Sequence, residues 1–254
     1  MKTSDLRDPR DPRYRYDEAF AAIEGLKWDP WVGSNYNRNN QPPLLIVGES
    51  HYFGKQLTET EEQKRIDHRV HRPLTREVVR DHGVGGVDNK AKNQRTYRNL
   101  ERVLLGAVPK DRTHFWNEVA YMNFIQEPMF WDAKKRQRPS PQHFAEAWHG
   151  FSRVLGVLKP RLCLFVGVGA AKYLALQKQK LELGDVAHFQ VGRNWAHRVT
   201  GRSPGGAETE IIFIQHLGAR FCSWSAWRGF LQKENPALIK RFEQAPFLNS
   251  GGIG

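Results

Sequence analysis

The chain has 254 residues, 39% of them hydrophobic, and this length suits a single α/β domain over residues 1–254 with a sizeable core. No apolar run has the length of a membrane span, and the N-terminal residues lack the apolar stretch of a signal peptide, so we expect a cytoplasmic protein with no membrane partner. The 39 Lys and Arg residues exceed the 27 Asp and Glu residues by 12, which favours a polyanion such as DNA as partner; a merely basic protein is the alternative.

The first quarter of the chain contains one strongly patterned segment. Residues 1–16 are rich in Arg, Asp and Pro and predict a loose basic arm, followed by a short helix at 17–25 and a loop at 29–43. The wholly apolar run 44–47 predicts a strand covered on both faces. It stops at Gly48, where polar residues begin, and we expect a loop there.

Residues 54–92 are polar and charged and form an insertion. Thr58 followed by Glu61 is a capping-box pattern, which predicts a helix to about residue 70. The glycine-rich stretch 81–92 predicts a mobile loop. Apolar residues at helical spacing then predict a helix at 94–107.

Strands and helices alternate in the second half of the chain. The expected elements are a strand at 119–125, a loop with three prolines, a helix from Ser140-Pro141 to Leu158, a strand at 162–166, a helix at 170–180, a hairpin of 189–191 with 196–200, a strand at 211–215 and a helix at 221–232. This alternation predicts a three-layer α/β/α fold with a central, mostly parallel sheet of four to five strands.

Polar residues follow the ends of the predicted strands. Glu49-Ser50-His51-Tyr52 follows the first strand, Asn123 lies late in the second, Gly167-Val168-Gly169 follows the third and His216 follows the fourth. Because ligands of parallel sheets bind at the carboxyl ends of the strands, these residues are expected to share an active-site cleft. Taken alone, Asn123 is equally well explained as a turn cap, and His216 is better explained as a core histidine.

Taken in order, these motifs resemble those of the uracil-DNA glycosylase superfamily, and most closely its bacterial iron–sulfur branch. The first motif is Gly48-Glu49-Ser50-His51-Tyr52, which corresponds to GQDPYH or GEAPG in the family. A strand ending at Asn123, a long helix, Lys159-Pro160, an apolar strand and Gly167-Val168-Gly169-Ala170-Ala171 follow, and the last motif is His216-Leu217-Gly218. The resemblance covers about residues 40–55 and 113–232, and it rests on the order and spacing of loose motifs.

The sequence departs from the family at three places. The chain has only Cys163 and Cys222, and the cysteines that bind the cluster are missing, so we expect no iron–sulfur centre, metal or other cofactor. Cys163 lies within an apolar strand and is expected to be a buried thiol. Ser50 replaces the Asp that activates water, and Leu217-Gly218 replaces the Pro-Ser after the last histidine.

The resemblance implies roles for the residues that contact the base. His216 would donate a hydrogen bond to the pyrimidine O2 as negative charge develops there, and Asn123 would read the Watson–Crick edge of a flipped-out base. Gly48 is the first residue of the motif and would lie beside the base. Tyr52 would block access to the 5-position of the base, and Phe53 is a candidate for stacking on the flipped-out base.

Glu49, Ser50 and His51 are the candidates for water activation. Glu49 is the only carboxylate of the motif, Ser50 can orient a water molecule, and His51 can act as a base near neutral pH. We hypothesise that Glu49 and His51 share the task of the missing Asp. The expected DNA contacts are Arg193, Arg198, Arg202, Arg220 and Phe221, the last two lying where the family inserts into the duplex.

The function expected from the resemblance is a monomeric DNA glycosylase that removes uracil or a modified pyrimidine from DNA. Two alternatives remain. The replacement of Asp by Ser50 is compatible with a protein that binds damaged or modified DNA without cutting it. The first motif by itself also resembles erythromycin-esterase-like hydrolases, which use Glu and His together, as Glu49 and His51 would here.

Overall fold

A seven-stranded sheet forms the centre of the computed structural model, which describes residues 14–38, 41–53, 67, 70–85, 94–130, 137–177, 181–202 and 208–243. The strands are β1 (Trp31–Val32), β2 (Leu44–Phe53), β3 (Val119–Phe130), β4 (Leu162–Val166), β5 (Ala187–Val191), β6 (Asn194–Arg202) and β7 (Glu208–Ile214). Their order in the sheet is β1-β3-β2-β4-β7-β6-β5.

The prediction of an α/β fold is confirmed, whereas the predicted size of the sheet is wrong. The four inner strands β3, β2, β4 and β7 run parallel, and the pairs β1–β3, β6–β7 and β5–β6 are antiparallel. Strand β1 has only two residues, which is too short for the alternation of apolar and polar residues that identifies a strand in a sequence. The predicted hairpin is present as β5 and β6, and it extends the sheet because β6 pairs with β7.

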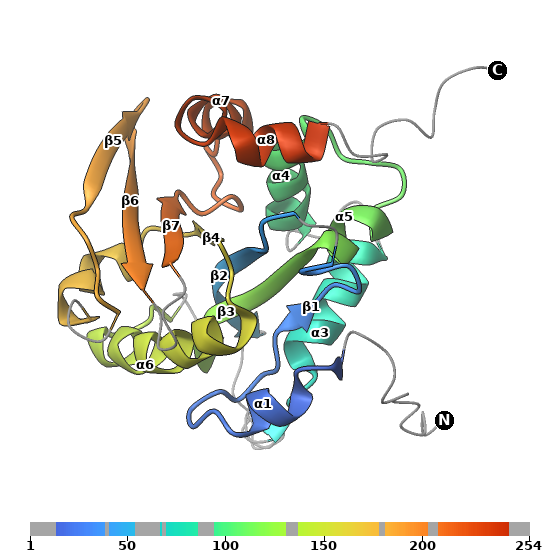
Figure 1. Ribbon diagram of the computed structural model, residues 1–254, viewed down its shortest axis with the longest axis vertical. Coiled ribbons are helices and arrows are strands. Elements are labelled where there is room, and N and C mark those ends of the chain that lie inside the picture. The colour runs from blue at the N-terminus through green and yellow to red at the C-terminus, as the bar shows by residue number, and fades with distance from the viewer. Residues whose placement is uncertain are drawn as a thin grey trace.

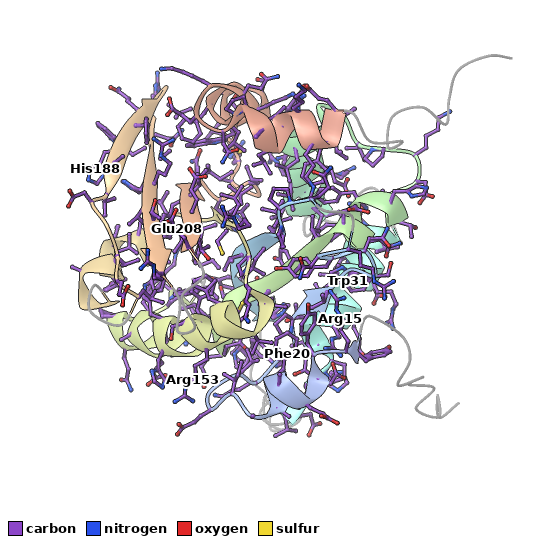
Figure 2. The ribbon with its side chains drawn as sticks, viewed as in Figure 1. Arg15, Phe20, Trp31, Arg153, His188 and Glu208 are labelled. Carbon is purple, nitrogen blue, oxygen red and sulfur yellow. The ribbon has the colours of Figure 1, made fainter. Side chains whose placement is uncertain are left out.

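Helices cover both faces of the sheet (Figure 1). They are α1 (Asp17–Ala21), α3 (Leu74–Val78), η2 (Val79–Val84), α4 (Gln94–Leu105), α5 (Thr113–Glu118), α6 (Pro141–Leu158), η3 (Ala170–Gln177), α7 (Trp224–Glu234) and α8 (Pro236–Glu243). One core lies between the sheet and α1, α6 and η3, and the other between the sheet and α4, α5, α7 and α8. Phe20 of α1 is fully buried in the first core (Figure 2).

Successive side chains of β2 enter different cores, as expected for a strand covered on both faces. Leu45 and Val47 belong to the core on the α6 side, whereas Leu44 and Ile46 belong to the core on the α4 side. This alternation of side chains is the geometric property of an extended strand, and it decides which way the following polar residues point.

Helix α6 begins and ends where the sequence predicts. Ser140 accepts a hydrogen bond on its hydroxyl from the backbone N–H of His143, the His143 ring accepts one from the Ser140 N–H, and Pro141 occupies the first turn. Lys159 ends the helix in the left-handed region with φ 46°, immediately before Pro160.

Three predicted boundaries are wrong. Glu49–Phe53 continues β2 instead of forming a loop, because it pairs with the far half of β3. Pro128 lies inside β3, where β1 no longer pairs, so its missing N–H breaks no bond with that strand. Asp81–Val84 belongs to η2 and not to a loop.

The remaining predicted elements differ in extent or type. The structure has α4 at Gln94–Leu105, a 3₁₀ helix at Ala170–Gln177 where an α-helix was expected, β7 from Glu208, and α7 from Trp224 followed by α8. Most of the arm 1–16 and most of the predicted helix at 58–70 lie outside the described residues, as do residues 86–92 of the insertion. The described part of the insertion at 70–85 contains α3 and η2.

The order of the parallel strands defines a crevice. The chain passes from β2 to its neighbour β3 by way of α4, on one face of the sheet. It then returns across β2 to β4 by way of α6, on the other face. The order therefore reverses between β2 and β4, and at such a switch point ligands bind beyond the carboxyl ends of the strands.

Candidate functional site

Glu49 lies at the switch point between β2 and β4. It points to the α6 side of the sheet, as Val47 does two residues earlier. A Cβ built on Gly167 or on Gly169 would be 3.3 Å from the Glu49 Oε2 atom, and one on Gly169 would be 3.0 Å from Phe144. The two glycines that follow β4 thus make room for this carboxylate.

A small cavity adjoins Glu49. Its volume is about 10 Å³, which matches one water molecule. The lining residues come from the middle of β2 and β3, from the end of β4 and from α6 and η3: Val47, Gly48, Glu49, Phe124, Phe144, Phe165, Gly167 and Ala170. Glu49 is the only one of these residues with an ionisable side chain, so the cavity joins a carboxylate to an otherwise apolar wall.

Asn123 approaches the same point of β2 from the α4 side. It is level with Gly48, and a Cβ on Gly48 would be 2.2 Å from the Asn123 Oδ1 atom. The Tyr121 hydroxyl donates a hydrogen bond of 3.1 Å to Oδ1. Burial raises the pKa of Tyr121 to about 12, so this hydroxyl stays protonated and fixes the orientation of the amide.

His216 follows β7 and packs against the start of α4. The backbone N–H of Gly218 donates a hydrogen bond of 3.1 Å to His216 Nδ1. In the neutral ring Nδ1 is then the acceptor, and Nε2 carries the proton. Asn99 of α4 donates to the carbonyl oxygen of Leu217 at 2.7 Å, which holds this loop on the α4 side.

His51 occupies a bulge in β2. The register with β3 shifts between Ser50 and Tyr52, and His51 lies between them. Its Nε2 is 3.0 Å from the Thr75 Oγ1 atom of α3, and its ring meets Trp28 edge-on at 5.0 Å. Glu49 and His51 therefore contact different elements of the fold.

The other residues of the first motif differ in their surroundings. The Ser50 hydroxyl oxygen is buried and has no hydrogen-bond partner among the residues that the structure describes. Tyr52 is half-buried and packs against the core on the α6 side. Phe53 belongs to β2, but its side chain lies outside the described part of the structure.

The predicted DNA-binding residues lie at two edges of the sheet. Arg193 in the β5–β6 turn and Arg220 after β7 are exposed at the carboxyl edge, and Phe221 is 85% exposed. Arg202 pairs with Glu208 at the start of β7, eight residues along β6 from Asn194 and so roughly 26 Å away. Arg202 is therefore not close to the strand ends that carry the other residues.

Arg198 has intramolecular partners. Its guanidinium group lies 3.8 Å from Glu210 and 3.5 Å from Glu234, and it stacks over Phe189 at 5.1 Å. These contacts join α7 to the hairpin, and we assign Arg198 to that packing.

The sequence gives no indication of several supporting residues. Thr75, Trp28 and Thr96 come from segments without a recognisable motif, and they contact the site only through the fold. Thr96 Oγ1 would be 2.5 Å from a Cβ on Gly218, which shows how closely α4 approaches the loop of His216. Tyr121 is the exception, because its position two residues before Asn123 on one strand places both side chains on the same face.

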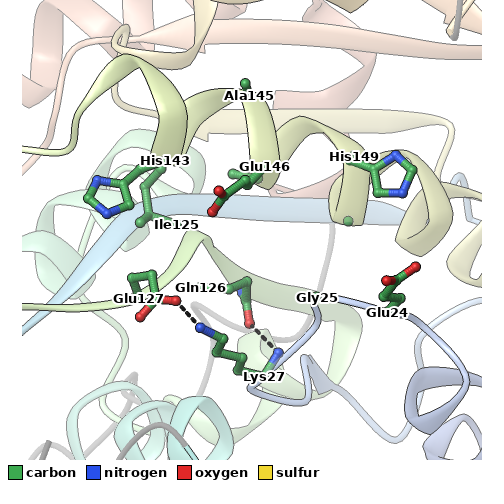
Figure 3. Close-up of a pocket in the computed structure, with 12 residues that line it drawn as sticks. Glu24, Gly25, Lys27, Ile125, Gln126, Glu127, His143, Ala145, Glu146 and His149 are labelled. Carbon is green, nitrogen blue, oxygen red and sulfur yellow. Dashed lines mark hydrogen bonds and ion pairs between the residues drawn. The ribbon is translucent and has the colours of Figure 1, made fainter.

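A second pocket, of about 480 Å³, lies between α6, the end of β3 and the segment after α1 (Figure 3). None of the predicted site residues lines it. Its carboxylates have partners: Glu127 pairs with Lys27, Glu24 is 3.6 Å from Arg153, and Glu146 accepts a hydrogen bond from Gln142. The contacts of these carboxylates are thus all within the protein, and the pocket stands apart from the residues that the sequence singles out.

Two kinds of feature are absent from the described residues. They contain no group of three or more His, Cys, Asp or Glu side chains that could hold a metal ion. In the same part of the chain no helix is long and apolar enough to cross a membrane. Cys163 is a buried free thiol, as predicted, and burial raises its pKa well above the usual value.

Comparison with known proteins yields no assignment. No protein-family model matches the chain, and no curated protein matches it.

Proposed function

We propose that this protein is a DNA glycosylase that hydrolyses the N-glycosidic bond of a flipped-out uracil or modified pyrimidine and leaves an abasic site. The observation that carries the proposal is the pair of groups on either side of Gly48. A carboxylate, Glu49, adjoins a water-sized cavity on the α6 side, and an oriented amide, Asn123, lies on the α4 side.

These two groups suit the charges of the reaction. Breaking the bond leaves positive charge on the sugar and negative charge on the departing base, so a carboxylate is needed near C1′ and hydrogen-bond donors near the base. In our proposal the glycosidic bond lies at the carboxyl edge of the parallel strands, beyond the contact of Asn123 with Gly48. The base then points to Asn123 and the sugar to Glu49.

His216 supplies the donor to the base. The Gly218 N–H donates to Nδ1, so in the neutral ring Nε2 carries the proton and is the atom that would donate to O2 of the pyrimidine. The contact of its loop with α4 keeps His216 on the side of the sheet where Asn123 lies. A neutral donor of this kind stabilises the developing oxyanion without requiring a charged imidazole.

Glu49 acts on the water molecule in this mechanism. The cavity beside Oε2 has room for one water, and its apolar walls strengthen the interaction of that water with the carboxylate. His51 contacts Thr75 instead, so we assign it to positioning this segment of β2 and no longer to a shared base. Ser50 remains a candidate for orienting substrate or water.

The test uses oligonucleotides that contain uracil, hypoxanthine or a modified cytosine. After incubation with the protein, heating in alkali converts abasic sites into strand breaks. We expect breaks with at least one of the pyrimidine substrates and their loss in His216→Ala. Absence of breaks with every substrate would overturn the proposal.

The same assay separates the two alternatives. Salt-dependent DNA binding without strand breaks would identify a protein that recognises modified DNA without cutting it. The esterase-like reading requires Glu49 and His51 to act together, and their contacts with different elements give it no support.

A further inference from the structure

Gln94 is a buried amide whose hydrogen-bonding atoms have no partner. The residue begins α4 and is 0% exposed, yet neither Oε1 nor Nε2 forms a hydrogen bond within the described part of the chain. Nearly all buried polar atoms in proteins are hydrogen-bonded, because leaving one unsatisfied costs the desolvation of that group. A buried glutamine whose side-chain oxygen and nitrogen both lack a hydrogen bond is therefore unusual, and the missing partners need an explanation.

The helix places Gln94 at the carboxyl edge of the sheet. Gln94 precedes Tyr97 by three residues, so the two side chains share one face of α4. The Tyr97 ring lies 5.7 Å from that of Tyr121, whose hydroxyl donates to Asn123. Gln94 is thus one turn beyond the Tyr97–Tyr121 contact, in the direction of the strand ends.

Ser50 brings a second unsatisfied group to this side of β2. It follows Gly48 by two residues and precedes the register shift, so it points to the α4 side as well. Its hydroxyl oxygen is buried without a partner. The same end of α4 contacts the loop of His216, where a Cβ on Gly218 would be 2.5 Å from Thr96 Oγ1.

We propose that Gln94 is a substrate-binding residue that contacts the N3 edge of the flipped-out pyrimidine; this inference rests on the proposed function. An amide offers one acceptor and two donors in a plane, which matches the adjacent donor and acceptor of a pyrimidine edge. Uracil presents N3–H to Oε1 and a carbonyl oxygen to Nε2. Cytosine and its 5-modified forms present an amino group to Oε1 and N3 to Nε2.

The arrangement of Asn123 favours this assignment. Its Oδ1 atom already accepts a hydrogen bond from Tyr121 and lies against Gly48, so its amide is partly used within the protein. Gln94 retains both of its atoms for a ligand. Gln94 then reads the base edge and Asn123 holds the ring. The Ser50 hydroxyl donates a second hydrogen bond to one of the carbonyl oxygens of the base, each of which has two lone pairs.

The experiment compares Gln94→Met, which keeps the length of the side chain and removes its polar atoms, with Gln94→Leu as a second apolar variant. Gln232→Met, at an exposed position of α7, is the matched control. Three quantities are measured on the full chain: the unfolding temperature without DNA, the single-turnover excision rate, and binding to an oligonucleotide with a tetrahydrofuran abasic analogue.

For both Gln94 variants we expect an unfolding temperature equal to or above that of the wild type, because an unsatisfied amide has been removed. The excision rate should fall roughly 10- to 100-fold, the loss expected for two hydrogen bonds to one base. Binding to the abasic analogue should not change, since it has no base to read. A lower unfolding temperature in both variants, or an unchanged excision rate, would overturn the role of Gln94.

Failure of the proposed function is distinguishable from failure of this inference. If the wild type excises no base, its thermal unfolding is followed with free uracil, thymine and cytosine. A stabilisation that is lost in Gln94→Met but kept in Gln232→Met would support a base-reading pocket without catalysis. No stabilisation by any base would overturn the pocket too.

Discussion

The amide oxygen of Asn123 lies directly over the α-carbon of Gly48, where a Cβ would come within 2.2 Å of it. The Tyr121 hydroxyl would be 2.3 Å from the same Cβ. Only glycine fits at this point of β2, and its lack of a side chain brings the Asn123 amide onto the backbone at the switch point of the sheet.

Replacing Gly48 by alanine should therefore damage both the fold and the site. The Tyr121 and Asn123 side chains are buried and hydrogen-bonded to each other, so they cannot move without losing that contact. We expect Gly48→Ala to lower the free energy of unfolding by about 1–3 kcal/mol, the usual cost of overpacking, as measured by urea denaturation.

Gly150 provides the matched control for that substitution. It is a buried residue of α6, but a Cβ there would meet nothing within 4 Å. Gly150→Ala should stabilise the protein by about 0.5–1 kcal/mol, because alanine is the better helix former. Equal destabilisation by both substitutions would show that the close contact at Gly48 is not the cause.

Glu49→Gln should abolish most of the activity without unfolding the protein. The amide keeps the size of the side chain beside Gly167 but cannot accept a proton from the water. We expect the single-turnover excision rate to fall by about 10²–10⁴-fold. Glu146→Gln, at an exposed position of α6, should leave the rate unchanged, and a similar loss there would argue against a specific role for Glu49.

The arginines at the carboxyl edge should contribute to DNA binding, whereas the one at the opposite edge should not. Each phosphate contact adds about 1 to the slope of log affinity against log salt concentration. Arg193→Ala and Arg220→Ala should each reduce that slope by about 1 in a titration of a labelled duplex. Arg202→Ala should bind like the wild type; a reduced slope in this variant would place DNA on a different surface.

The histidine pair of the hairpin should make stability depend on pH. His188 and His197 face each other with Nδ1 atoms 2.8 Å apart, and the pKa of His197 is lowered from 6.5, first by burial and then by the charge of His188. With a depressed folded pKa, the contribution to stability is present above about pH 6.5 and is lost as the pH falls through the folded value.

Urea denaturation at about pH 7.5 and about pH 5.5 tests this linkage. The wild type should lose stability on acidification, and His197→Gln should lose less, because the variant has no depressed pKa at this position. If the difference between the two pH values is the same in both proteins, the pair does not control the pH dependence.

The sequence predicted the elements whose pattern is local. Leu44–Val47 and Leu162–Val166 are apolar throughout and became central strands, and Ser140-Pro141 began α6 because capping depends on adjacent residues. It did not predict that Glu49–Phe53 is strand, since those polar residues are held extended by pairing with β3. Pro128 was assigned to a loop for the same reason: proline prefers loops, and only the pairing of β3 with β2 shows that this residue lies in a strand.

The sequence by itself determined that a carboxylate, an amide and an imidazole lie within or just after the parallel strands of the sheet, because the apolar runs mark where those strands are. Only the tertiary structure decided on which side of the sheet each of them acts. Alternation along β2 and the glycine turn after β4 send Glu49 to the α6 side, and the bulge turns His51 to Thr75. Gln94 could not be predicted from the sequence either. Whether its amide is buried and hydrogen-bonded depends on residues that are distant along the chain, and among the described residues it has no partner.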